Sequence, residues 1–267
     1  GGLRWKKDDE TLDEYGLRSA TYLEDKILAI GPNKVAAFIA ETMMGSIVGD
    51  VPPAKNYWKH IRAICDKYDV HLILDEIYCG LGRSGKIYCC EWDNITPDFV
   101  CVGKNLAAGY APLSAVITSS KVEDIIKNGT GRIQLGHNYQ GYSLGVAAAL
   151  AVQKIVHEED MLTHINETGV YMRNYLKTEL GDHPFFREIR GRGLIFSIEY
   201  SCKNMNEFGL SLQKKMEQEN GILINAKWHR VSFVPAYIIN RQQVDLALEL
   251  FVKAFKELAD IWSKRDC

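Results

Sequence analysis

The sequence lacks a basic excess, a long apolar run and a signal peptide. Its 32 lysines and arginines are balanced by 34 aspartates and glutamates, which leaves a formal net charge of −2. Because a nucleic-acid backbone calls for an excess of basic side chains, such a partner is not expected. No apolar run reaches the roughly 18 residues of a membrane span, and the opening GGLRWKKDDE has no apolar core for secretion. We expect a soluble, cytoplasmic protein that binds small molecules and no membrane.

The cysteines follow no zinc-ligand spacing and are odd in number, so we expect neither a metal site nor a disulfide framework. Most of them lie inside apolar runs, which favours buried free thiols in a reducing compartment. They are Cys65, Cys79, Cys89, Cys90, Cys101, Cys202 and Cys267.

The first half of the chain alternates between predicted strands and helices. Hydrophobic residues make up 46% of the sequence, which is ample for a folded core. Apolar residues at helical spacing predict a first helix over 11–28 and a second that follows Pro52 and Pro53. Short apolar runs predict strands buried on both faces, as in a mostly parallel sheet of an α/β fold. These strands cover 34–41, 70–76, 99–103 and 114–119.

From Ser143 the pattern changes to long helical periodicity, followed by a mixed tail. The tail predicts one strand over 186–200, a helix around 210–219, strand-like residues over 222–239 and a last helix from Arg241. We therefore expect a large domain over 1–158 and a smaller α+β domain over 159–267. Asn240 and Gln243 form a capping box for the last helix. Its predicted inner side consists of Val244, Leu246, Leu248, Phe251, Phe255 and Leu258.

The glycine-rich stretch GLGRSGK, residues 80–86, matches two nucleotide-binding patterns, G-x-G-x-x-G and G-x-x-x-x-G-K. Both patterns require a helix after the glycines, whose N-terminus meets the phosphates, but the sequence after Lys86 has no helical stripe. The second pattern also needs Ser or Thr after the lysine, where this chain has Ile87. We favour a loop whose glycines let Arg83 cross the ends of the strands.

Charged residues of opposite sign end two of the predicted strands, Asp75 and Lys104. In open α/β sheets ligands bind beyond the carboxyl ends of the strands, so both side chains could face one molecule. A lysine whose amine is deprotonated can bond a carbonyl carbon. An aspartate can pair with a protonated pyridine nitrogen, which together with the lysine indicates pyridoxal phosphate (PLP) as cofactor. The alternative for Lys104 is a surface lysine at a strand end.

Around this pair the chain resembles the class III aminotransferases of PLP fold type I. The matching segments are ILDEI, GLGRSGK and TPDFVCVGK, in the family's order and at family-like spacing. Further matches extend over nearly the whole chain, from VAAFIAE to FVPAYII. The resemblance implies a mostly parallel sheet in a large domain with a smaller α+β C-terminal domain.

By position, the resemblance implies that Lys104 forms a Schiff base with PLP and that Asp75 pairs with the pyridinium nitrogen. Ile77 is implied to pack on one face of the cofactor ring, and Tyr78 to stand near its phenolic oxygen. Asn138 takes the place of a family threonine that reaches the cofactor phosphate of the partner subunit, where an amide could donate as well.

Several positions depart from the family pattern. Glu41 matches the family's strand-end glutamate, in a role that is either structural or catalytic, but Thr42 follows it in place of proline. Ser232 stands where relatives often carry an arginine for the substrate carboxylate, and Arg230 lies two residues earlier, so no carboxylate clamp is assigned. The family's phosphate loop and stacking aromatic have no counterpart before Glu41, and we expect the chain to lack the family's N-terminal portion.

The implied activity is transfer of an amino group from an amine or ω-amino acid to a keto acid, in a homodimer with its site at the subunit interface. Other PLP fold type I reactions, such as racemisation, use the same lysine and aspartate. A catalytically silent dimerisation module is the alternative from another class, and a nucleotide-binding protein is the third. The sequence does not identify the donor or the acceptor.

Overall fold

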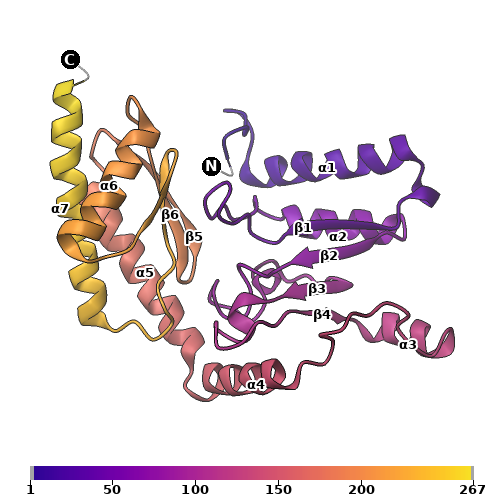
Figure 1. Cartoon of the computed structure of the whole chain (residues 1–267). Coiled ribbons are helices and arrows are strands. Elements are labelled where there is room, and N and C mark those ends of the chain that lie inside the picture. Colours follow the sequence, from indigo (N-terminus) through magenta and orange to yellow (C-terminus); the bar gives the residue numbers. More distant parts are fainter. Residues whose placement is uncertain (1–2, 266–267) are drawn as a thin grey trace.

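The structure is a computed structural model that describes residues 3–265, and it contains two separate β-sheets (Figure 1). The first sheet has the order β1-β2-β3-β4, and the second the order β5-β6-β8-β7. In the first sheet β1 to β3 run parallel and β4 pairs antiparallel with β3, so the sheet is mixed and mostly parallel. Its strands are β1 (Ala37–Glu41), β2 (His71–Asp75), β3 (Phe99–Val102) and β4 (Ala115–Thr118).

Helices α1 (Leu12–Ile30) and α2 (Tyr57–Lys67) pack on one side of this sheet. The apolar sides of these helices form a core with every second side chain of the strands, which points toward them. That core includes Ala20, Ile27, Trp58, Ile61, Leu72 and Leu74. The opposite side is open in the described part of the chain, where Ile39 is 62% and Val116 64% exposed. The expectation that the strands are buried on both faces is therefore wrong here, because helices pack against only one of them.

The second sheet is antiparallel and carries its own core. Its strands are β5 (Phe186–Arg192), β6 (Ile195–Tyr200), β7 (Asn225–Lys227) and β8 (Arg230–Phe233), and its helices are α5 (Met161–Leu180), α6 (Met205–Asn220) and α7 (Arg241–Arg265). The residues predicted as one strand over 186–200 form a hairpin instead. Gly191 and Gly193 have positive φ angles of 137° and 51°, which allow the chain to reverse between β5 and β6.

The capping box of α7 is confirmed. The Asn240 side chain accepts from the Gln243 N–H at 3.0 Å, and the Gln243 side chain accepts from the Asn240 N–H at 3.0 Å. The predicted inner residues of α7 are buried with one exception, since Leu246 is 56% exposed.

Two further helices connect the sheets, α3 (Ser120–Asn128), which the sequence did not predict, and α4 (Ser143–Glu158) (Figure 1). Gln153 of α4 donates to the carbonyls of Asn105 and Leu106, both at 3.1 Å. This ties α4 to the turn that follows Lys104. None of the helices in the described part is both long and apolar enough to cross a bilayer.

Cys65, Cys79, Cys89, Cys90 and Cys101 carry free thiols. Cys267 lies outside the described residues.

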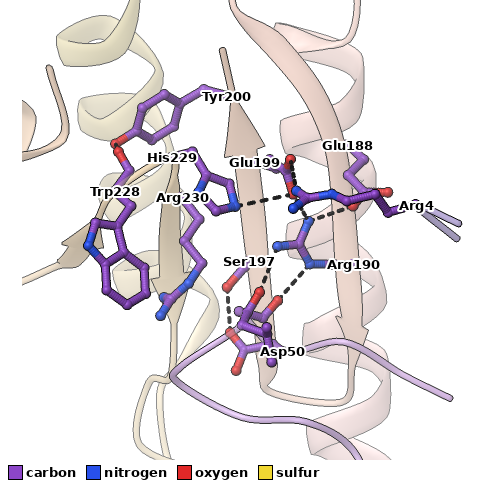
Figure 2. Close-up of polar contacts among 12 residues, drawn as sticks. Arg4, Asp50, Glu188, Arg190, Ser197, Glu199, Tyr200, Trp228, His229 and Arg230 are labelled. Carbon is purple, nitrogen blue, oxygen red and sulfur yellow. Dashed lines mark hydrogen bonds and ion pairs between the residues drawn. The ribbon is translucent and has the colours of Figure 1, made fainter. Parts of the chain in front are cut away.

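The loop after β1 docks onto the second sheet through Arg190 of β5 (Figure 2). Arg190 Nε donates to the Gly49 carbonyl at 2.7 Å, and Nη2 donates to the Val48 carbonyl at 3.0 Å. The same guanidinium pairs with Glu188 and Glu199, so its charge is compensated although it is buried. Buried charges need such partners, and this one joins two distant parts of the chain.

Asp50 follows in the same loop and is completely buried against the second sheet (Figure 2). Its Oδ2 accepts from the Ser197 hydroxyl at 2.5 Å. The Ser232 hydroxyl contacts Ser197 at 2.8 Å and accepts from Arg230 Nη1 at 2.8 Å. Burial raises the pKa of Asp50, and the neighbouring serines, Arg230 and Arg190 offset this only in part.

Replacing Asp50 by asparagine tests this environment. Because the pKa of Asp50 in the folded protein is raised above its ordinary 3.8, the native state holds the proton more tightly than the unfolded chain. The Asp50 contribution to stability therefore falls as pH rises from about 4 through the folded pKa. We expect the unfolding free energy of D50N, relative to the unmodified chain, to improve by up to about 1.4 kcal/mol per pH unit in that window. Urea unfolding between pH 4 and 7 measures it, and a difference that stays flat would contradict the assignment.

A second prediction concerns Gly169 in α5, where a Cβ atom would lie 2.0 Å from the Gly193 carbonyl oxygen. Helix propensity alone would favour alanine here by about 0.5–1 kcal/mol. Because the contact is with backbone that cannot rotate away, we expect Gly169→Ala to destabilise the protein by about 1–3 kcal/mol instead. The exposed Thr178→Ala in the same helix serves as control and should stay within about 0.5 kcal/mol. Thermal and urea unfolding report both, and a stabilised Gly169→Ala would be the contrary result.

Candidate active site

The structure brings Asp75 and Lys104 to the same edge of the first sheet. Asp75 ends β2 and lies in register with Cys101 of the parallel strand β3. Lys104 follows β3 after Gly103 and opens a short 3₁₀ turn. Its φ of 42° is in the left-handed region, which a residue with a β-carbon seldom adopts. This backbone geometry turns the lysine out of the strand direction at the carboxyl end of the sheet.

Asp75 is half-buried and has one carboxylate oxygen available. Its Oδ1 accepts from the Ile77 N–H at 2.9 Å, which fixes the side chain over the start of the following loop. In the described chain no donor contacts Oδ2. A carboxylate held in this way can accept one more hydrogen bond from a ligand.

The neighbouring Glu76 points the other way and has a structural role. It is 1% exposed and accepts from the Thr42 hydroxyl at 2.9 Å and from the Cys89 and Cys90 N–H groups at 2.6 and 2.8 Å. Burial raises the pKa of Glu76, and these three donors lower it in part. Glu41 accepts from the Gly45 N–H at 2.8 Å, which closes the loop after β1.

Ile77 and Tyr78 lie beside Lys104. A Cβ atom on Gly103 would stand 3.5 Å from Ile77 Cγ2, so the isoleucine packs on the backbone just before the lysine. The Lys104 amine lies 5.6 Å from the centre of the Tyr78 ring. The same ring packs against Gly45, where a Cβ atom would come within 2.4 Å of the ring carbon Cδ1. Burial and the adjacent Asp50 carboxylate raise the pKa of Tyr78 to about 12, so its hydroxyl stays protonated.

A cavity of about 860 Å³ opens at Lys104. Its walls come from the loop after Lys104, from α4 and from the segment after β8, so both halves of the chain contribute. Sequence reasoning missed this second wall, which includes Tyr237. The only earlier sign of it was the resemblance of FVPAYII to the family. The lining includes Arg83, Tyr110, Leu113, Val152, Val156, Tyr237 and Ile238.

The remaining predicted residues lie elsewhere. Asn138 is exposed, in a stretch between α3 and α4 without helix or strand, and does not join the group around Lys104. Ser232 and Arg230 are buried in the network with Asp50 and do not line the cavity. The positions of these two residues therefore provide no carboxylate clamp at Lys104.

The glycine loop over residues 80–85 has no free amide groups for a phosphate. Its N–H groups from Leu81 to Gly85 donate to carbonyls of residues 79–87, at 2.6 to 3.3 Å. The chain after Lys86 forms a 3₁₀ segment (Cys89–Asp93) and no α-helix before β3. A phosphate cradle needs both the free amides and the helix N-terminus. The loop instead contacts the second half of the chain, where Tyr237 donates its hydroxyl to the Leu81 carbonyl at 3.0 Å.

Comparison with known proteins gives consistent matches over nearly the whole chain. The family model described as aminotransferase class-III matches residues 5–255. An aminotransferase of Gibberella zeae is 34% identical over 262 residues, which cover 91% of this chain and 50% of that protein. The chloroplastic gamma aminobutyrate transaminase 3 of Solanum lycopersicum is 36% identical over 267 residues, which cover 96% of this chain and 50% of that protein.

Solved structures agree with these sequences. The crystal structure of the omega transaminase of Pseudomonas jessenii in complex with PMP matches with a TM-score of 0.89 at 32% identity, covering 98% of this chain and 59% of that one. The chain thus spans about half the length of the curated relatives it matches. Because the family match includes both sheets and the strand ends that carry Asp75 and Lys104, the chain belongs to the class-III aminotransferase family.

Proposed function

We propose that this chain acts in a PLP-dependent aminotransferase that moves an amino group from an amine or ω-amino acid to a keto acid. The observation that carries the proposal is the placement of Asp75 and Lys104 at the carboxyl ends of two adjacent parallel strands. Relatives named as a gamma aminobutyrate transaminase and an omega transaminase support a substrate whose reacting amino group is distant from its carboxylate.

The residues at this edge fit the cofactor. Lys104 is exposed and lines the cavity, so its amine is accessible to an aldehyde. Asp75 has one oxygen without a protein donor, which suits a protonated ring nitrogen. When bound, PLP supplies an aldehyde for the amine and a ring that withdraws electrons from the substrate carbon.

Each residue then has a definite task. Lys104 Nζ would hold the cofactor covalently, and its amine would also carry a proton to and from the substrate carbon. Asp75 keeps the proton on the ring nitrogen. Ile77 would pack on one ring face, and Tyr78, whose ring centre lies 5.6 Å from the Lys104 amine, would stand near the phenolic oxygen.

We further propose a homodimer in which Asn138 reaches the cofactor phosphate of the partner subunit. The stretch around Asn138 supports this, because it exposes large apolar side chains: Ile133 is 71%, Leu135 86% and Tyr139 81% exposed. Residues 159–267 would form the smaller α+β domain, supported by the separate core of the second sheet. Free thiols support a reducing, cytoplasmic location.

Chemical trapping tests the proposal. The 267-residue chain incubated with PLP and reduced with borohydride should carry the cofactor on Lys104, located by mass spectrometry of peptides. In Lys104→Ala the label should drop to background and amino transfer to a keto acid should be lost, because Lys104 directly follows the strand that pairs with the Asp75 strand. The exposed Lys121→Ala is the matched control and should keep the label.

Two outcomes would contradict the proposal. One is undiminished labelling or turnover in Lys104→Ala. The other is product formation at the same rate with and without a keto acid, which would indicate racemisation or another PLP reaction instead of amino transfer.

A further inference from the structure

Two buried cysteines, Cys79 and Cys89, lie in one small core where the two halves of the chain meet. They are 1% and 0% exposed, and they pack with Met43 from the loop after β1 and with Ile195 from β6. The thiol of Cys79 lies within hydrogen-bonding reach of the Cys89 sulfur. A small movement of the side chains is therefore enough to join the two sulfurs.

The backbone of the glycine loop keeps this pair together. Inside the loop the Leu81 N–H donates to the Ile87 carbonyl at 2.6 Å, so the chain folds back on itself. Cys79 and Cys89 lie two residues outside this pair, one on each side, and thus at the base of the loop. Their contact follows from the pairing of the loop and does not depend on flexible side chains.

Cys89 has a cation beside its sulfur. Arg192 Nη1 lies 3.9 Å from Cys89 Sγ, and a 3.3 Å ion pair with Asp93 holds the guanidinium in place. The contact with Cys79 lowers the pKa of Cys89, and Arg192 acts in the same direction, while burial opposes both. Contact with Cys89 and burial raise the pKa of Cys79. Because the thiolate is the reactive form, Cys89 is the sulfur that reacts with an oxidant first.

Cys90 follows directly in the chain but belongs to a different core, that of α1, α2 and the first sheet. Burial and the adjacent Glu76 carboxylate raise the pKa of Cys90, so a thiolate is disfavoured there. Two neighbouring cysteines of one segment thus have opposite environments. Cys90 therefore serves as a matched control for Cys89.

We propose that Cys79 and Cys89 form a redox-sensitive pair, which hydrogen peroxide converts into a disulfide across the base of the glycine loop. Because both sulfurs are buried, the oxidant has to be small and uncharged. The Cys89 thiolate attacks one peroxide oxygen, the O–O bond breaks, and the other oxygen leaves as water with the thiol proton, which gives a sulfenic acid. The Cys79 sulfur then attacks the Cys89 sulfur, and its proton leaves with the hydroxyl group as a second water. The two thiols are oxidised, the peroxide is reduced to two waters, and a thiol reductant reverses the change.

The disulfide acts on a loop that joins the two halves of the chain. Arg83, at the centre of the loop, donates to the carbonyls of Leu194 and Pro235. A covalent bond across the base restricts the opening of this loop and thereby stabilises the junction. The inference needs no cofactor and does not depend on the proposed function.

Peptide mapping tests the pair. The purified 267-residue chain is treated with hydrogen peroxide, its remaining thiols are blocked with N-ethylmaleimide in denaturant, and trypsin then cuts after Arg83 and Lys86 inside the loop. Peptides 68–83 and 87–104 should appear linked through Cys79, two hydrogens lighter than their sum, and should separate on reduction with dithiothreitol. If peroxide leaves the two peptides unlinked, the proposal is wrong.

Variants locate the bond. Cys89→Ser should abolish the link, whereas Cys90→Ser should keep it at the level of the unmodified chain. In Cys79→Ser the sulfenic acid has no second thiol to attack, so dimedone should label Cys89. A link that survives in Cys89→Ser and disappears in Cys90→Ser overturns the assignment.

Hydrogen exchange measures the effect on the loop. In the oxidised chain the amides of residues 80–88 should exchange at least about threefold more slowly, and reduction should restore the original rate. Cys79→Ser treated with the same peroxide is the control for oxidation of other residues and should show no slowing. Equal exchange in the linked and reduced chains would show that the disulfide does not restrain the loop, which contradicts the proposed switch.

Discussion

Buried arginines that donate to backbone carbonyls of the other half of the chain are the interaction on which the site depends. Arg83, in the loop after β2, donates to Leu194 and Pro235 of the second half. Arg190, in the second sheet, donates to Val48 and Gly49 in the loop after β1. One arginine thus donates from the first half of the chain to the second, and the other donates from the second half to the first. Together they hold the carboxyl ends of β1 and β2 against the second sheet, so the site edge cannot move independently of it.

Tyr78 contacts the loop after β1 and lies near Lys104. Its ring packs against Gly45, the Lys104 amine lies 5.6 Å from the ring centre, and its hydroxyl lies near Asp50. Displacement of either loop would therefore shift the surface on which the lysine rests. Lys104 itself depends on a backbone angle that only the surrounding turn maintains. The geometry of the reacting amine thus follows from contacts made far along the chain.

The sequence predicted the elements that have strong local signals. The strand ends at Asp75 and Lys104, the capping box of α7 and the non-nucleotide nature of the glycine loop all follow from local patterns and appear in the structure.

Long-range features could not be predicted in this way. The sequence around Gly193 fits one continuous strand, because the glycine does not disturb the alternation of side chains on either side of it. The chain nevertheless reverses there. Leu246 fits the helical stripe, yet it is exposed because no element packs over it. The contacts of Arg83 with Leu194 and Pro235 depend on how the two halves of the chain fold together, which spacing alone does not reveal.

We propose that Asp75 and Lys104 hold two ends of one cofactor at the edge of the first sheet. The most direct test is a crystal structure of the chain grown with PLP and reduced with borohydride. We expect continuous density from Lys104 Nζ to the cofactor, with the ring nitrogen hydrogen-bonded to the Asp75 oxygen that has no donor in the described chain. Density on another lysine, or a ring nitrogen facing away from Asp75, would contradict it.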